Sequence, residues 1–105
     1  MKEMTPAEFS ERRGAGESFI LLDVREHEEL AIASVDGTTH IPMGEITARI
    51  SELDPDAPIV CMCHHGMRSA SVASFLEQSD FTNVTNLTGG IDRWAIEVDV
   101  ALARY

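Results

Sequence analysis

The sequence has few basic residues, only two cysteines and no long apolar run. Its 105 residues include 8 Lys and Arg against 18 Asp and Glu, which gives a net charge of −10 at pH 7 with histidine neutral. Such a surface repels nucleic acid and anionic membranes, so we expect neither as a partner. No apolar stretch approaches the roughly 20 residues that span a bilayer, and residues 1–6 lack the pattern of a secretory signal. We therefore expect a cytoplasmic protein.

The two cysteines, Cys61 and Cys63, stand one residue apart. A disulfide between them would be badly strained, and a reducing compartment would keep both as thiols. Cys61 lies inside an apolar run, which favours a core residue over a resolving thiol. Cys63 follows that run at the start of a loop, which favours a nucleophile over a small core residue.

No repeat, low-complexity segment or Gly/Ser linker divides the chain. We therefore expect one domain over residues 1–105, with residues 96–105 as a C-terminal tail. The expected strands are at 19–22, 38–41, 59–62 and 84–87, and the expected helices at 6–14, 26–33, 43–53, 69–79 and from 90 onward. Because strands alternate with helices, the sequence predicts an α/β fold with a parallel sheet covered on both faces. Ligands bind such sheets beyond the carboxyl ends of the strands.

The segment 63–69 leaves the most apolar expected strand and enters a helix. A tight loop before a helix points several backbone N–H groups inward and forms an anion-binding cradle. Gly66 permits a positive φ or a close approach to a ligand. The cradle and the nearby Arg68 favour the thiolate of Cys63, and Arg68 can hold an anion with two donors.

A metal site is the weaker interpretation of this segment. Five residues could supply zinc ligands: Cys61, Cys63, His64, His65 and His40. The paired spacing of zinc knuckles is missing, and the adjacent side chains of His64 and His65 cannot easily converge on one ion. We therefore expect no metal and no cofactor.

Four segments together resemble motifs of the single-domain rhodanese family of sulfurtransferases. Residues 63–69 resemble its active-site loop, and residues 22–26 resemble its Asp-x-Arg segment. Residues 37–46 resemble its Gly-His-Ile-Pro-Gly-Ala motif, although Thr38 and Thr39 separate the glycine from the histidine, and residues 87–94 resemble its Leu-x-Gly-Gly-x-x-x-Trp motif. The resemblance implies a three-layer α/β/α domain around a central, mostly parallel five-stranded sheet.

The resemblance also implies sulfur transfer in two steps through a persulfide on the catalytic Cys63. The donor would be thiosulfate or polysulfide, and the acceptor cyanide or a thiol. The residues expected to bind the substrate are His64, His65, Gly66, Met67, Arg68 and Ser69, and those expected to support the site are Asp23, Arg25, His40, Gly89 and Gly90. Arg68 is the candidate clamp for a sulfonate group, and the two histidines would add positive charge below about pH 6.5.

The supporting residues have structural alternatives. Asp23 either accepts N–H groups of the active-site loop or ends its strand as a turn residue. Arg25 is expected to form an ion pair with Glu29 of small energetic value, and His40 is expected to be a hydrogen-bonded structural residue. Gly89 and Gly90 are expected to let the backbone pass close behind the loop.

Two other functions remain open at the level of sequence. The first is a phosphatase or arsenate reductase of the same fold, but the phosphatase loop has five residues between Cys and Arg, and here four separate Cys63 from Arg68. The second is a non-enzymatic sulfur carrier or sensor. The acidic surface favours a protein donor or acceptor with a basic docking face.

Overall fold

The fold is known from a computed structural model that describes all residues, Met1–Tyr105. One sheet holds five strands in the order β1-β5-β4-β2-β3, and every neighbouring pair is parallel. The strands are β1 (Lys2–Met4), β2 (Ile20–Asp23), β3 (Thr38–His40), β4 (Ile59–Met62) and β5 (Val84–Leu87). The α-helices are α1 (Pro6–Gly14), α2 (His27–Ile32), α3 (Ile46–Arg49), α4 (Met67–Gln78) and α5 (Gly90–Glu97). The predicted α/β fold is therefore confirmed.

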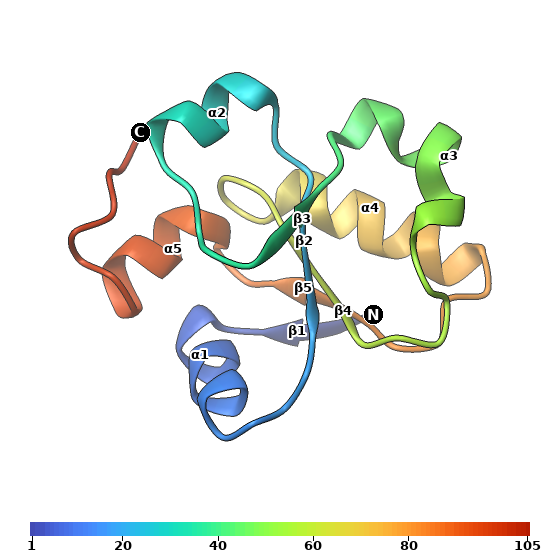
Figure 1. Cartoon of the computed structure of the whole chain (residues 1–105), viewed down its shortest axis with the longest axis horizontal. Coiled ribbons are helices and arrows are strands. Elements are labelled where there is room, and N and C mark those ends of the chain that lie inside the picture. The colour runs from blue at the N-terminus through green and yellow to red at the C-terminus, as the bar shows by residue number, and fades with distance from the viewer.

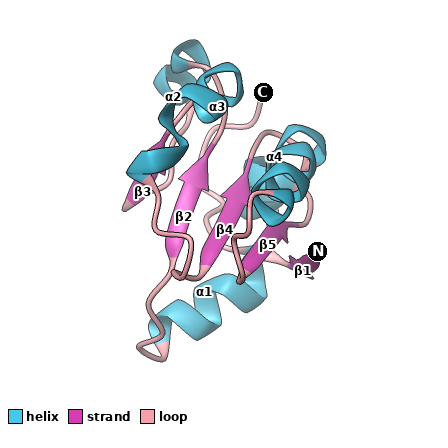
Figure 2. Cartoon of the chain, turned by 90° about the vertical axis from the view of Figure 1, so that its right-hand side faces the viewer, coloured by secondary structure: helices cyan, strands magenta, loops and turns pink.

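The sheet buries both of its faces, and alternate residues of each strand point to opposite cores. Leu22 and Cys61 face α3 and α4, in a cluster of 13 buried residues. Leu21 and Val60 face α1 and α5, in a second cluster of 10. Figure 1 shows α3 and α4 on one side of the sheet and α1 and α5 on the other, with α2 across the end. In Figure 2 the strands lie side by side with α4 against them.

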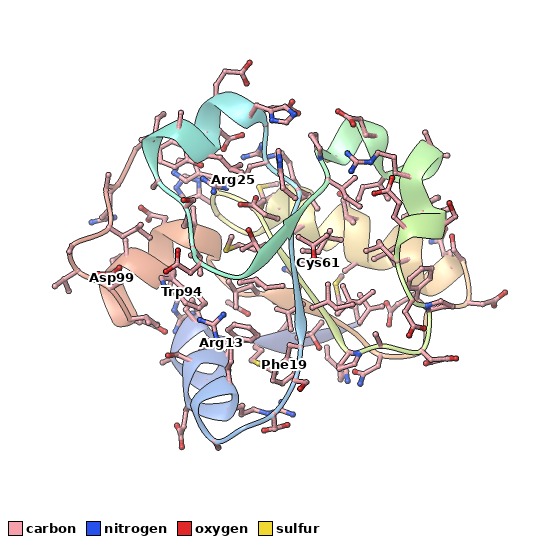
Figure 3. The ribbon with its side chains drawn as sticks, viewed as in Figure 1. Arg13, Phe19, Arg25, Cys61, Trp94 and Asp99 are labelled. Atoms are coloured by element: carbon pink, nitrogen blue, oxygen red, sulfur yellow. The ribbon has the colours of Figure 1, made fainter.

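The layer formed by α1 and α5 is held by aromatic contacts. The Phe9 ring lies 5.2 Å from that of Phe19 and 5.7 Å from that of Trp94. The Arg13 guanidinium lies 5.6 Å from the Trp94 ring centre, and Figure 3 shows the two side chains meeting between the helices. Such cation–π contacts strengthen the packing of the two helices.

The start of α1 follows the sequence signal closely. Thr5 is the N-cap, its hydroxyl accepts the Glu8 N–H, and the Glu8 carboxylate accepts the Thr5 N–H. Pro6 occupies the first turn, where its missing N–H costs nothing. This capping fixes the direction in which the chain leaves β1.

Two elements differ from the sequence prediction. Strand β1 was not predicted, because it is a three-residue edge strand in which only Met4 is buried. The predicted helix 43–53 is instead a 3₁₀ turn (Met43–Glu45), a short α3 and a second 3₁₀ turn (Ile50–Glu52). Gly44 and the β-branched Thr47 weaken a regular helix here.

None of the helices combines the length and the apolar character that crossing a bilayer requires.

Candidate active site

Cys63 lies at the carboxyl end of β4, at the base of the loop that leads into α4. Its Sγ accepts the Gly66 N–H at 3.0 Å, and the side chain is almost fully buried. The backbone N–H groups of residues 64, 65 and 67–69 donate to no group of the protein. The loop therefore leaves these donors free for a ligand, which is what an anion-binding cradle requires.

Two glycines let the loop close tightly. Gly66 has φ +106°, in the left-handed region that disfavours a side chain, and caps α4. Gly90 has φ +61°, and a Cβ there would lie 2.4 Å from the carbonyl oxygens of Cys63 and His64. The N–H of Ile91 donates to the Cys63 carbonyl at 2.9 Å. The start of α5 thus packs directly behind the active-site loop, which confirms the predicted close passage at Gly90.

Asn86 on β5 is a buried residue of the site that the sequence did not reveal. Its Oδ1 lies 2.6 Å from the Ser69 hydroxyl, which also lies 3.3 Å from Cys63 Sγ. Its Nδ2 donates to the Gly66 carbonyl at 3.1 Å and to the Glu3 carboxylate. Asn86 therefore ties the middle of the loop, at Gly66, and its helix end, at Ser69, to the sheet. The available signal was a pair of polar residues, Thr85 and Asn86, between the apolar ends of a short strand.

Asp23 and Arg25 form a fully buried ion pair, so the predicted pairing of Arg25 with Glu29 is wrong. Arg25 Nη2 lies 2.8 Å from Asp23 Oδ2, and Nε lies 3.0 Å from Oδ1. Asp23 also accepts the Arg25 N–H and none from the active-site loop. The Nε2 of His40 lies 2.6 Å from the Arg25 carbonyl, which confirms the expected structural histidine. Figure 3 shows Arg25 just below α2, where the pair braces that helix against the sheet.

Arg68 is engaged by Glu29 of α2. The two guanidinium nitrogens Nη1 and Nη2 lie 2.6 and 2.8 Å from the two carboxylate oxygens. The Tyr105 hydroxyl donates to the same carboxylate at 2.6 Å. Hydrogen bonding to Arg68 lowers the pKa of Glu29 to about 2, and the same contact raises the pKa of Arg68. The candidate sulfonate clamp is therefore held in a neutral pair.

The segment after α5 folds back over the loop. Tyr105 stacks on His64 with the ring centres 3.8 Å apart and the planes 5° from parallel. Tyr105 also accepts a hydrogen bond from Arg25 Nη1 at 2.9 Å. Figure 1 shows this end of the chain beside α2. Desolvation, with the charge of His65, lowers the pKa of His64, so this histidine is neutral near pH 7.

His64, His65 and Asp92 are the residues that could hold a metal ion. One ligand atom from each lies within 4.8 Å of the others, and the two histidine rings are 3.8 Å apart. The side chains of the adjacent histidines thus lie closer together than the sequence spacing suggested. The Nε2 of His64 is buried without a partner. Asp92, however, already accepts two hydrogen bonds from Arg104, which an ion would have to displace.

Cys61 belongs to the core, as predicted. It is fully buried in the cluster below α4, and burial raises the pKa of its thiol to about 12. At neutral pH it is therefore a thiol without access to substrate.

The fold and the loop together define an α/β domain built to present one cysteine in a cradle of backbone N–H groups. The chain belongs to the rhodanese family, since residues 5–97 match the rhodanese-like domain.

Curated relatives and solved structures agree with this assignment. The chain is 38% identical over 94 residues to the "Putative sulfurtransferase YtwF" of Bacillus subtilis (strain 168), covering 90% of each chain. It is 30% identical over 93 residues to "Thiosulfate sulfurtransferase GlpE" of Ectopseudomonas mendocina (strain ymp), covering 89% of this chain and 84% of that protein. A crystal structure of a rhodanese-related protein from Thermoplasma volcanium superposes with a TM-score of 0.84 at 32% identity, covering 93% of this chain and 94% of that one.

Proposed function

We propose that this protein is a sulfurtransferase that moves sulfane sulfur from a donor such as thiosulfate or polysulfide to a thiophilic acceptor, cyanide or a thiol. The observation that carries the proposal is the position of Cys63 Sγ, 3.0 Å from the Gly66 nitrogen, in a loop whose other backbone N–H groups have no partner within the protein. Relatives named sulfurtransferases support the same reaction class.

The reaction has two steps. The Cys63 thiolate attacks the outer sulfur of the donor, the bond to the rest of the donor breaks, and Cys63 carries a persulfide. The N–H groups of residues 64–69 stabilise the negative charge of the outer sulfur. The acceptor then attacks that sulfur and releases the Cys63 thiolate, so covalent catalysis divides one transfer into two easier ones.

The four-residue spacing between Cys63 and Arg68 makes a tight loop. A tight loop favours a single sulfur over a phosphate or arsenate with its oxygens, so hydrolysis of an aryl phosphate is not expected. The two unpaired thiols favour a reducing compartment, and we place the protein in the cytoplasm.

A protein donor or acceptor with a basic docking face would suit the net charge of −10. Transfer to such a partner is expected to weaken with added salt, because ionic screening acts on charged surfaces. Transfer that does not respond to salt would exclude this mode of docking.

The test is formation of thiocyanate from cyanide and a sulfane donor, with Cys63→Ser and Cys61→Ser side by side. We expect Cys63→Ser to abolish turnover and Cys61→Ser to retain it, because only Cys63 lies in the loop with the free donors, whereas Cys61 is buried in the core. Turnover that survives in Cys63→Ser would refute the proposed mechanism.

A further inference from the structure

Sulfur donors differ in charge, and the charge near Cys63 decides which of them can bind. Thiosulfate is a small dianion. In a thiol hydropersulfide, R–S–S–H, the outer sulfur is attached through a second sulfur to an organic group R, and the terminal S–S–H group carries at most one negative charge. A dianion that loses its water shell needs compensating positive charge. The cations around the loop are therefore the relevant feature.

Arg68 is the cation of the loop, and both of its terminal nitrogens are bound to Glu29. The Tyr105 hydroxyl holds the same carboxylate from the other side. The side chain of Glu29 is 17% exposed and that of Arg68 is 35% exposed, so the pair is partly shielded from solvent. A bidentate pair of this kind carries no net charge toward an incoming anion.

The other cations near the site are also engaged. Arg25 is buried against Asp23, and Arg104 is bound to Asp92. His64 is stacked between His65 and Tyr105. The cradle therefore offers N–H dipoles for one anionic sulfur and no unpaired guanidinium for a sulfonate.

One exposed apolar side chain belongs to the loop itself, where α4 begins. Met67 is the first residue of that helix, and its side chain is 82% exposed. An exposed apolar side chain in this loop suits the organic part of a thiol better than it suits an inorganic dianion.

From this geometry we infer that Glu29 determines donor specificity: by neutralising Arg68 it disfavours dianionic inorganic donors and makes thiol hydropersulfides the preferred substrates. The inference rests on the proposed function. In the transfer, the Cys63 thiolate attacks the outer sulfur of R–S–S–H, and a new S–S bond forms. The old S–S bond breaks, R–S⁻ leaves with the electron pair, and the proton remains with the Cys63 persulfide, so no oxidant is needed.

The test compares kcat and KM for glutathione hydropersulfide and thiosulfate in wild type and Glu29→Gln. Glutamine keeps an oxygen that accepts the Glu26 N–H, so the start of α2 is preserved. We expect wild type to use the hydropersulfide at least tenfold more efficiently than thiosulfate. In Glu29→Gln the KM for thiosulfate should fall about tenfold, because Arg68 is released, with less than a twofold change for the hydropersulfide.

Two further variants separate this effect from general changes. Glu28→Gln removes the same charge from an exposed neighbour without an ion pair, and it should change neither KM more than twofold. In Glu29→Gln/Arg68→Gln the KM for thiosulfate should return to the wild-type value, because the lower KM of Glu29→Gln depends on the Arg68 guanidinium.

An equal preference for the two donors in wild type, or an unchanged thiosulfate KM in Glu29→Gln, would overturn the inference and leave sulfur transfer intact. The mass of the wild-type protein after exposure to each donor shows whether the proposed function itself fails. If neither donor adds a sulfur atom to Cys63, the proposed function is wrong, and the specificity inference is wrong with it.

Discussion

The buried pair of Asp23 and Arg25 should be the most sensitive electrostatic feature of this fold. Both side chains are fully inaccessible, and their atoms meet at 2.8 and 3.0 Å. Arg25 also donates to the Ala33 carbonyl at 2.9 Å and to Tyr105. Removing one partner leaves an uncompensated buried charge, which costs about 3–5 kcal/mol. We therefore expect Asp23→Ala to be severely destabilised.

The expected loss can be expressed as a melting temperature. With about 2.1 cal/mol/K per residue, 105 residues have an unfolding entropy of about 0.22 kcal/mol/K, so Asp23→Ala should lower Tm by about 14–23 °C. Thermal unfolding followed by circular dichroism measures this shift. Arg12→Ala, which breaks an exposed pair with Glu17, is the control and should change Tm far less.

A double variant tests the cause. Asp23→Leu/Arg25→Met removes both charges and keeps apolar volume, so it should recover at least half of the loss. If Asp23→Ala lowers the free energy of unfolding by less than about 1 kcal/mol, or if the double variant is as unstable as the single one, the ion pair does not stabilise the fold electrostatically.

Three further predictions concern the loop and its supports. Gly90→Ala should lower the free energy of unfolding by about 1–2 kcal/mol from its left-handed backbone alone, and it should slow sulfur transfer because the new side chain pushes the loop forward. Urea unfolding and turnover assays measure the two effects. The control Gly14→Ala, which has open space around it, should show neither effect. Asn86→Ala should lower the free energy of unfolding by about 1–3 kcal/mol, because buried partners lose their hydrogen bonds. It should also slow the alkylation of the Cys63 thiol by iodoacetamide. An unchanged alkylation rate would exclude a positioning role for Asn86. Glu29 has a pKa lowered from 4.5 to about 2, so its contribution to stability is complete above pH 4.5 and is lost as pH falls toward 2. The stability difference between wild type and Glu29→Gln should therefore shrink between pH 5 and pH 2 in urea titrations, and a constant difference would contradict the pairing.

Much of the architecture could be predicted because local signals coincide with the global fold. Thr5, Pro6 and Glu8 form a complete capping box, and the apolar run at 59–62 is the central strand. The order of strand, cysteine, glycine and helix likewise predicted the tight loop after Cys63, with Gly66 at the start of α4. Strand β1 escaped notice because its identity depends on pairing with β5, more than 80 residues away, and not on its own composition.

The partners of charged residues were the least predictable part of the site. Arg25 lies four residues from Glu29, which suggested a local pair, yet Arg25 turns inward to Asp23 and Glu29 binds Arg68 from a distant helix. Tertiary packing selects among the possible partners, so spacing along the chain does not by itself identify the pair. Asn86 was missed for the same reason, because its hydrogen bonds reach Ser69 at the start of α4 and Glu3 on β1, both far away in the sequence.

The most direct test of the account is the intact mass of the protein after incubation with glutathione hydropersulfide or thiosulfate, with and without later cyanide. We predict that wild type gains the mass of one sulfur atom, that cyanide removes it, and that Cys63→Ser gains nothing. An unchanged mass with both donors, or a gain that persists in Cys63→Ser, would contradict a persulfide at Cys63 as the centre of the chemistry.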